Sequence, residues 1–281
     1  MKLRGAIAAA VTPMRDGGRE LDLEGVAPLA THVAAGGLDG VLVAGTTGEG
    51  VLLSVDERRQ LTERWIAERP EGFAVAVHAG AQTTRDTIAL AAHASERGAD
   101  AVAVIAPPYF PLDETELLSH LASAAHACNP LPFYVYEFVG RSGYAIPIPV
   151  IHQLREQAPN LTGLKVSDLP FEAVKPYLLD GLDVFIGQEP LFLEGAAAGA
   201  VGSVSGLASA WPDVVARLVH NGDKQAHERV IALRDATAGL PFIGALKAVL
   251  ASRGVVTSDD VRPPLRRLTE AERAMLTPLI A

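Results

Sequence analysis

Lys165 is the residue of this sequence with the clearest chemical implication. It lies in the run LTGLKVSD, whose side chains would alternate between the two faces of a β-strand. The apolar Leu164 and Val166 share one face, which must pack against other elements, so we expect Lys165 to point into the interior of the sheet. A lysine removed from water has a lowered pKa, and its neutral amine can attack a ketone to form a Schiff base. The structural alternatives are a buried ion pair and a side chain that reaches water at the strand end.

Tyr136 and Arg141 follow a second strand-like run, in FYVYEFVGRSG. A phenol close to a neutral lysine could carry protons during imine formation and carbon–carbon bond cleavage. The commoner fate of a tyrosine is a half-buried ring with its hydroxyl at the rim. Arg141 lies in a Gly-flanked loop, where its planar guanidinium could hold a substrate carboxylate or could simply face solvent.

A turn rich in glycine and threonine, GTTGEG at 45–50, ends another strand-like run. Its small residues would let the backbone N–H groups and hydroxyls of Thr46 and Thr47 approach an anion closely. The pattern is neither G-x-G-x-x-G nor a P-loop, so it does not indicate a nucleotide site. A nest for a carboxylate or a small phosphate stays open, as does a tight turn that needs its glycines for geometry alone.

Three further residues lie at predicted strand ends and are weaker candidates by themselves. Gly187 and Val204 could offer backbone carbonyls to a ligand, and His78 could act as an acid or base or be an ordinary core histidine. The histidines show neither H-x-x-x-H nor H-x-E spacing, and the chain has a single cysteine, Cys128. We therefore expect no metal site.

The elements that must position these residues follow a regular alternation. Short apolar or β-branched runs are each followed by a longer stretch whose apolar residues recur every three to four positions, which is typical of strand–helix units and a parallel sheet. Eight such units in about 210 residues favour a closed (β/α)8 TIM barrel of α/β class over an open sheet. Its active site would lie at the carboxyl ends of the strands. The predicted strand runs are 5–13, 40–50, 73–80, 99–110, 131–138, 160–168, 182–189 and 199–206.

Beyond the eighth run the pattern is helical. We expect residues 1–210 to form the barrel core, and residues 211–281 to supply its last helix and additional C-terminal helices packed on it. A separate domain is the alternative, but about 70 residues bury little core of their own.

Composition excludes several classes. The 281 residues are 49% hydrophobic, which is too much for a disordered chain. Lys and Arg number 24 against 33 Asp and Glu, a net charge of −9 without a basic cluster, which predicts no nucleic-acid binding. No apolar run approaches the roughly 18 residues of a membrane span. The apolar run near the N-terminus is too short for a secretory signal, so we expect a cytoplasmic protein that does not bind membranes.

Taken together, three motifs resemble those of the dihydrodipicolinate synthase / N-acetylneuraminate lyase family, the class I pyruvate-dependent aldolases. The motifs are the turn at 45–49, Tyr136 with Arg-Ser-Gly at 141–143, and Gly-Leu-Lys at 163–165. The resemblance covers the whole chain, since the order of the eight units and the helical tail also fit. It implies (β/α)8 subunits, usually homotetramers, that bind pyruvate or another 2-oxo acid as a lysine imine. We therefore expect a homo-oligomer, a tetramer or a dimer, that needs no cofactor.

The resemblance also implies roles. Lys165 would be the Schiff-base lysine, and Tyr136 the proton-transfer residue. Thr46 and Thr47 would bind the carboxylate of the 2-oxo acid, with Thr47 also hydrogen-bonded to Tyr136 and thereby taking part in catalysis.

Gly187 and Val204 match positions that line the pyruvate pocket of the family. Arg141 matches the carboxylate-binding arginine of the dihydrodipicolinate branch.

Other positions depart from the branches of the family. Phe110 follows Pro108-Tyr109 where the dihydrodipicolinate branch usually has a second tyrosine, and Glu137 and Val139 replace its common Asn and Pro. In the sialic acid branch an Asp-Glu pair contacts the sugar, whereas this chain has Glu at 189 followed by Pro, and Thr46 where that branch has Ser.

These observations favour a lyase that acts on pyruvate or a 2-oxo acid, such as a 2-oxo-3-deoxy sugar acid, through a lysine imine. The alternative enzyme is 4-hydroxy-tetrahydrodipicolinate synthase of lysine biosynthesis, which condenses pyruvate with aspartate semialdehyde. Two other classes stay open: a ligand-binding or structural barrel without a working amine, and a phosphate-binding barrel such as a phosphosugar isomerase.

Overall fold

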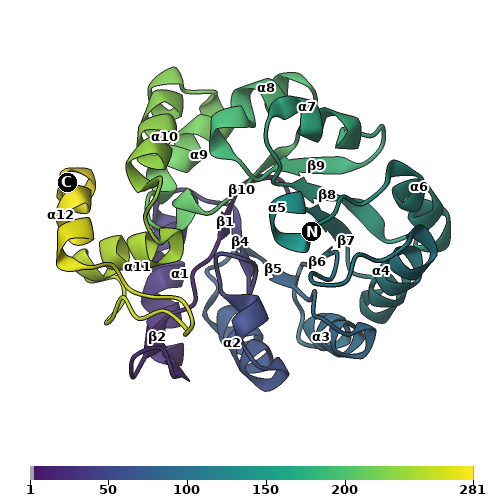
Figure 1. Ribbon diagram of the computed structural model, residues 1–281, viewed down its shortest axis with the longest axis horizontal. Coiled ribbons are helices and arrows are strands. Elements are labelled where there is room, and N and C mark those ends of the chain that lie inside the picture. The colour runs from purple at the N-terminus through teal and green to yellow at the C-terminus, as the bar shows by residue number, and fades with distance from the viewer. Residues whose placement is uncertain (1–2, 281) are drawn as a thin grey trace.

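Eight parallel strands close into a barrel in the computed structural model, which describes residues 3–280 (Figure 1). Each of the eight predicted runs supplies one barrel strand. The barrel strands are β1 (Gly5–Ala9), β4 (Gly40–Val43), β5 (Ala74–His78), β6 (Ala101–Ile105), β7 (Phe133–Glu137), β8 (Leu161–Val166), β9 (Asp183–Ile186) and β10 (Gly202–Ser205). A short hairpin of β2 (Met14–Arg15) and β3 (Glu20–Leu21) follows β1.

Helices surround the barrel and cover the outer face of the sheet (Figure 1). They are α1 (Val26–Ala35), α2 (Val55–Glu68), α3 (Thr84–Glu96), α4 (Glu114–Cys128), α6 (Ile148–Gln157), α7 (Phe171–Val174), α8 (Phe192–Ala197) and α9 (Pro212–Asn221). Short segments lie between them: α5 (Val139–Ser142) and the 3-10 turns η1 (Leu23–Gly25), η2 (Gly50–Leu52), η3 (Lys175–Tyr177), η4 (Glu189–Leu191) and η5 (Leu207–Ser209).

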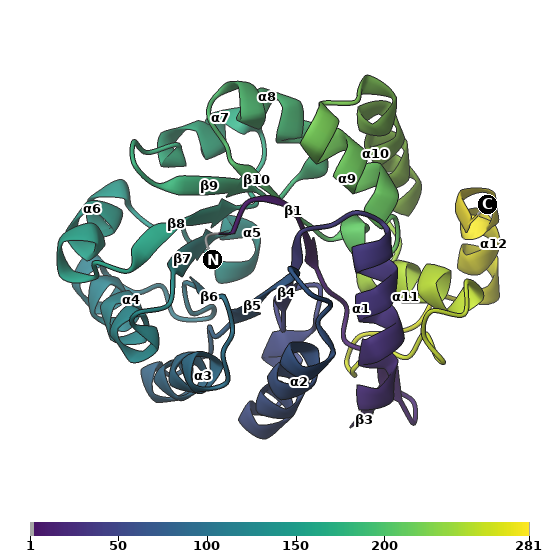
Figure 2. The same cartoon turned by 180° about the vertical axis from the view of Figure 1, so that it is seen from behind.

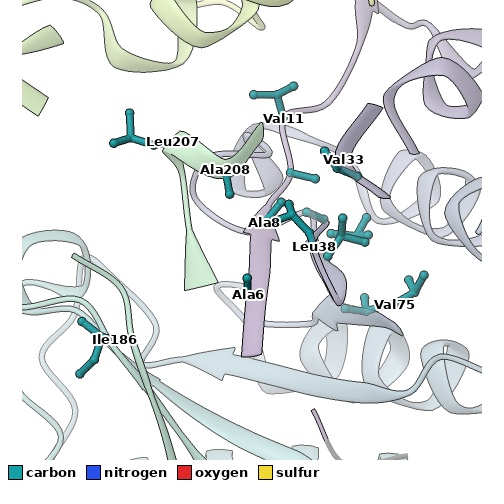
Figure 3. Packing of buried hydrophobic residues seen from close by; sticks show 14 of the residues in the cluster. Ala6, Ala8, Val11, Val33, Leu38, Val75, Ile186, Leu207 and Ala208 are labelled. Atoms are coloured by element: carbon teal, nitrogen blue, oxygen red, sulfur yellow. The ribbon is translucent and has the colours of Figure 1, made fainter. Parts of the chain in front are cut away.

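The strands are almost completely buried because they pack on both faces, as parallel strands do. Side chains alternate between two apolar clusters. Ala6 and Ala8 face the helices, and Figure 3 shows them in β1 near Leu38 of the surrounding cluster. Ile7 and Ala9 belong to the cluster inside the barrel. This alternation is the physical basis of the sequence argument for Lys165.

Three helices follow α9 and extend the molecule on one side: α10 (Lys224–Thr237), α11 (Phe242–Ser252) and α12 (Glu270–Ile280). α9 packs against β1, α10 packs against α9, and α11 packs against α12. Figures 1 and 2 both place this group on the side of the barrel away from α4 and α6. The (β/α)8 barrel with additional C-terminal helices is confirmed, and the division into residues 1–210 and 211–281 stays a prediction.

Among the described residues, no helix has both the length and the apolar character needed to cross a membrane.

Candidate active site

A cavity of about 320 Å³ opens at the carboxyl ends of the barrel strands. Seven of the residues proposed from the sequence line it, whereas His78 lines a smaller neighbouring cavity. The seven residues are Thr46, Thr47, Tyr136, Arg141, Lys165, Gly187 and Val204. The tertiary structure thus brings together residues from five different strand ends, which is where barrel enzymes place their chemistry.

Lys165 points into the barrel, as the strand pattern predicts. It is only 6% exposed, while its neighbours Leu164 and Val166 join the outer apolar cluster. Tyr136 is the register partner of Lys165 in the adjacent strand. The lysine Nζ lies 3.6 Å from the centroid of the Tyr136 ring, so the ammonium group faces the π surface of the phenol.

Tyr136 is 1% exposed, and its hydroxyl meets the Thr46 Oγ1 at 3.2 Å. Desolvation by itself would raise the pKa of this phenol. The charge of Lys165, together with hydrogen bonding at the hydroxyl, outweighs desolvation and lowers the pKa. The family resemblance implied that Thr47 makes this contact with Tyr136, and that expectation is wrong. The hydroxyl of Thr46 makes the contact, whereas that of Thr47 lies toward Gly206.

The turn at 45–50, which lines the cavity through Thr46 and Thr47, contains unused backbone donors. Neither Thr46 N–H nor Thr47 N–H donates a hydrogen bond to any group in the described part of the chain. The turn is held in an unusual backbone conformation, with Ala44 at φ 55° and Glu49 at φ 59°. Gly50 is required for its shape, because a Cβ there would overlap the Ala44 carbonyl oxygen. Two backbone N–H groups without a protein partner, in a turn that lines the same cavity as Lys165, are donors of the kind that bind anions.

Lys247 holds this turn in place through Glu49, and the sequence did not single out this lysine. It is 1% exposed in α11 and pairs with the fully buried Glu49 carboxylate. Its Nζ also donates to the Asp260 carbonyl at 2.8 Å, and the second Glu49 oxygen accepts from Arg262 N–H at 2.6 Å. A single lysine in the apolar run FIGALKAVLAS is the signal that could have revealed it.

Arg141 lies at the rim of the cavity in α5. It is exposed, and its guanidinium carbon lies 5.4 Å from the centre of the Phe138 ring. It also lines two adjacent cavities, one of about 460 Å³ toward α11 and one of about 120 Å³ beside His78. The guanidinium can therefore reach ligand groups that enter from the rim.

The opposite wall comes from α10 and the start of α11. Arg234 lines the cavity, packs on the Phe242 ring, and donates from Nε to Glu189 Oε2 at 2.7 Å. Glu189 is fully buried, and its other oxygen accepts from Ser205 Oγ and from Leu207 N–H. This carboxylate is occupied by the protein itself and is not available to a substrate.

Two other residues, Ser167 and His78, lie at the strand ends close to Lys165 and Tyr136. Ser167, which shares the inner face with Lys165, lines the cavity, and a side chain at Gly187 would overlap its hydroxyl. His78 packs edge-on against the Tyr136 ring. Burial and the nearby charges of Arg58 and Lys165 lower the pKa of His78 to about 3, so it is a neutral core histidine at neutral pH.

No group of three or more His, Cys, Asp or Glu side chains suited to a metal ion occurs within residues 3–280. The arrangement that does occur is a buried amine, a phenol of lowered pKa and a turn with unpaired N–H groups, all lining one cavity at the carboxyl ends of the strands. The fold and this cavity define the class of (β/α)8-barrel enzymes, which carry their active sites at that end of the barrel.

Comparison with known proteins agrees with this class. The sequence matches the model of the Dihydrodipicolinate synthetase family over residues 2–281. The chain belongs to this family, whose relatives include dihydrodipicolinate synthases and N-acetylneuraminate lyases, and it is an enzyme of the lyase class.

Two relatives and one solved structure illustrate the range of similar proteins. An uncharacterized DapA-like lyase of Halobacterium salinarum is 32% identical, over 98% of this chain and 92% of its own. The 4-hydroxy-tetrahydrodipicolinate synthase of Thermus thermophilus is 32% identical, over 93% of this chain and 90% of its own. The structure of Proteus mirabilis N-acetylneuraminate lyase superposes with a TM-score of 0.89 at 29% identity, covering 98% and 96% of the two chains.

Proposed function

We propose that this protein is a lyase that binds pyruvate or a larger 2-oxo acid as an imine on Lys165. The observation that carries the proposal is the placement of the Lys165 amine within 3.6 Å of the Tyr136 ring centre, in the same cavity as the free N–H groups of Thr46 and Thr47. The N–H groups would hold the carboxylate and thereby orient the ketone toward the amine.

The reaction would proceed in balanced steps through these groups. The Tyr136 phenolate takes a proton from the Lys165 ammonium, and the neutral Nζ attacks C2 of the 2-oxo acid. The C2 oxygen then receives one proton from the attacking nitrogen and one from the Tyr136 phenol and leaves as water, which gives a protonated imine and the phenolate. In a 4-hydroxy-2-oxo acid the C4 hydroxyl then loses its proton to the phenolate, the C3–C4 bond breaks, and its electron pair moves toward the imine nitrogen.

Release of the products uses the same proton-transfer groups. The aldehyde departs, Tyr136 returns a proton to C3 of the enamine, and water releases pyruvate and the lysine. Loss of water from C3–C4 of a bound 2-oxo-3-deoxy acid would begin from the same imine.

The favoured substrate class is a 2-oxo-3-deoxy sugar acid. Beyond the carboxylate nest, the cavity continues past polar groups that suit hydroxyls, namely Gln188, Arg234 and Thr237. The buried Glu189 is engaged with Arg234 and Ser205, which does not support a sialic acid site in which a carboxylate contacts the sugar.

The second candidate is 4-hydroxy-tetrahydrodipicolinate synthase. It is favoured by Arg141, which lines the cavity and which the resemblance matches to the carboxylate-binding arginine of that branch, and by the Thermus thermophilus relative. Phe110 argues against it, because the phenylalanine lacks a hydroxyl and its side chain is 70% exposed, next to Tyr109.

The direct test is reduction of the protein with borohydride in the presence of pyruvate, followed by mass spectrometry. A stable mass increase on Lys165, absent from Lys165→Ala and retained by the exposed-site control Lys224→Ala, is expected. An unchanged mass would point instead to a ligand-binding barrel without a working amine.

Substrate choice needs a second assay. Release of pyruvate and an aldehyde from a panel of 2-oxo-3-deoxy acids, 2-oxo-3-deoxygluconate among them, would be compared with condensation of pyruvate and aspartate semialdehyde. Activity in the second assay alone would reverse the order of the two candidates.

The proposed active form is a cytoplasmic homo-oligomer, a tetramer or a dimer. Tyr109 and Phe110 support an interface, because they form an exposed edge-to-face aromatic pair on the loop after β6, and Tyr109 is held at φ 87°.

A further inference from the structure

Two buried carboxyl groups hold the segment that carries Arg141, at residues 139–146. At its start, Val139 N–H donates to Asp168 Oδ1 at 2.9 Å. At its end, Ile146 N–H donates to Glu137 Oε2 at 2.9 Å. Glu137 is 1% exposed and Asp168 is 8% exposed. Both ends of the Arg141 segment therefore depend on the same two side chains.

Each carboxyl uses one oxygen in this way, which leaves its second oxygen to be satisfied. Glu137 Oε1 and Asp168 Oδ2 are buried and find no donor among the N–H and O–H groups of the described residues. The two residues lie at adjacent strand ends, since Ser167 N–H donates to the Glu137 carbonyl at 3.0 Å, and each carboxyl shifts the pKa of the other. Two carboxylates cannot hydrogen-bond to each other, since neither has a proton and their charges repel, whereas one proton between them satisfies both oxygens.

We infer that Glu137 and Asp168 share one proton, held on Glu137, and that this acid–carboxylate pair positions the Arg141 segment over the active-site cavity. The inference rests on the proposed function only for the role of Arg141 toward a substrate. Glu137 follows Tyr136 in β7 and so lies on the opposite face of that strand from the phenol. The pair does not touch the reacting atoms; its members are positioning residues.

The side chains around Glu137 and Asp168 explain why a proton, and not a cationic side chain, links the two carboxyls. Tyr177 from η3 donates to the Ile146 carbonyl at 2.9 Å, and Tyr144 within the segment donates to the Pro107 carbonyl at 3.1 Å. These phenols are neutral, and no lysine, arginine or histidine of residues 3–280 forms an ion pair with either carboxyl. Burial, with the negative charge of Asp168, raises the pKa of Glu137 to about 8. Above that pH the pair carries two like charges.

Hydrogen exchange of the full-length protein measures the pair without a substrate. The quantity is the protection factor of the amides at 139–146, corrected for intrinsic exchange, between pH 6.5 and 9.5. In the wild type we expect protection to fall about tenfold above pH 8, the factor that corresponds to loss of one such hydrogen bond.

Two conservative variants test the shared proton. Glu137→Gln supplies a permanent N–H donor to Asp168 and an acceptor for Ile146 N–H. The protection factors of the amides at 139–146 in this variant should therefore stay constant between pH 6.5 and 9.5. Asp168→Asn supplies a donor to an ionised Glu137 and should be constant as well. Glu137→Ala should be less protected at every pH. Wild-type pH dependence in both Glu137→Gln and Asp168→Asn would overturn the inference.

Steady-state kinetics shows whether the position of the Arg141 segment affects substrate binding. The substrate is 2-oxo-3-deoxygluconate, and its KM is measured at pH 7 and pH 9 for the wild type and for Glu137→Gln. We expect the KM of the wild type to rise about fivefold or more relative to the KM of the variant. We expect kcat to be equal in the two proteins. Equal KM profiles would restrict the pair to a structural role and overturn its positioning function. Borohydride trapping of pyruvate on Lys165 should be the same in both. Loss of trapping in the wild type would remove the proposed function but leave the exchange result intact, so the two failures are distinguishable.

Discussion

Lys247 and Glu49 form a buried ion pair that joins the C-terminal helices to the turn at 45–50 at the mouth of the barrel. Glu49 belongs to the same turn as Thr46 and Thr47, which line the cavity and whose N–H groups have no partner among the described residues. The C-terminal helices therefore do more than cover the barrel, because they hold the backbone that would grip a carboxylate.

The first prediction concerns this pair. Lys247→Met leaves the Glu49 carboxylate buried without its cation, and breaking a buried pair costs about 3–5 kcal/mol of folding free energy. Denaturant unfolding should show that loss. The double variant Glu49→Gln/Lys247→Met should recover part of it, since no charge is then left buried. A double variant no more stable than the single one would mean that the two residues are not coupled.

Tyr136→Phe should reduce turnover about 10²- to 10⁴-fold, the usual contribution of a positioned proton carrier. The ring would still fill its place, and the loss would be confined to the contacts of the hydroxyl, including the one of 3.2 Å with Thr46, so the thermal midpoint should change little. Pyruvate should still be trapped on Lys165 by borohydride, but more slowly. Wild-type turnover in this variant would exclude Tyr136 as the proton carrier.

His78 should make stability depend on pH. Its pKa is about 3 in the folded protein against an ordinary 6.5, so the unfolded chain binds more protons between these values. This contribution to stability is complete above pH 6.5 and is lost as the pH falls toward 3.

His78→Gln tests this contribution. The difference in unfolding free energy between wild type and variant should shrink on acidification through that window. His152→Gln, at an exposed helical position, is the matched control and should show no such trend. Parallel curves for wild type and His78→Gln would contradict the assignment.

The exposed aromatic pair predicts association. If Tyr109 and Phe110 lie in an interface between copies, Phe110→Asp should lower the mass measured by light scattering at micromolar concentration. Phe110→Leu, which keeps the apolar character, should retain the wild-type mass. A wild-type mass in Phe110→Asp would place the interface elsewhere.

Much of this protein could be predicted from the sequence by itself. The alternation of short apolar runs with helical stretches predicted the closed barrel, because a strand buried on both faces and an amphipathic helix have different periods. The same period of two placed Lys165 on the inner face, since Leu164 and Val166 had to face the helices. Chemistry-bearing residues at strand ends were then expected to meet, because parallel strands in a barrel end at one rim.

Only the tertiary structure decided which groups contact one another. Thr46 and not Thr47 reaches Tyr136, because the sharp turn beginning at Ala44 sets the direction of each side chain. Lys247 reaches Glu49 across about 200 positions of the chain, and no local pattern encodes that distance. The carboxyls of Glu137 and Asp168 come from neighbouring strand ends, and burial without a cation makes them a pair. Such contacts depend on packing between distant segments, whereas period and composition report only on each segment and its neighbours.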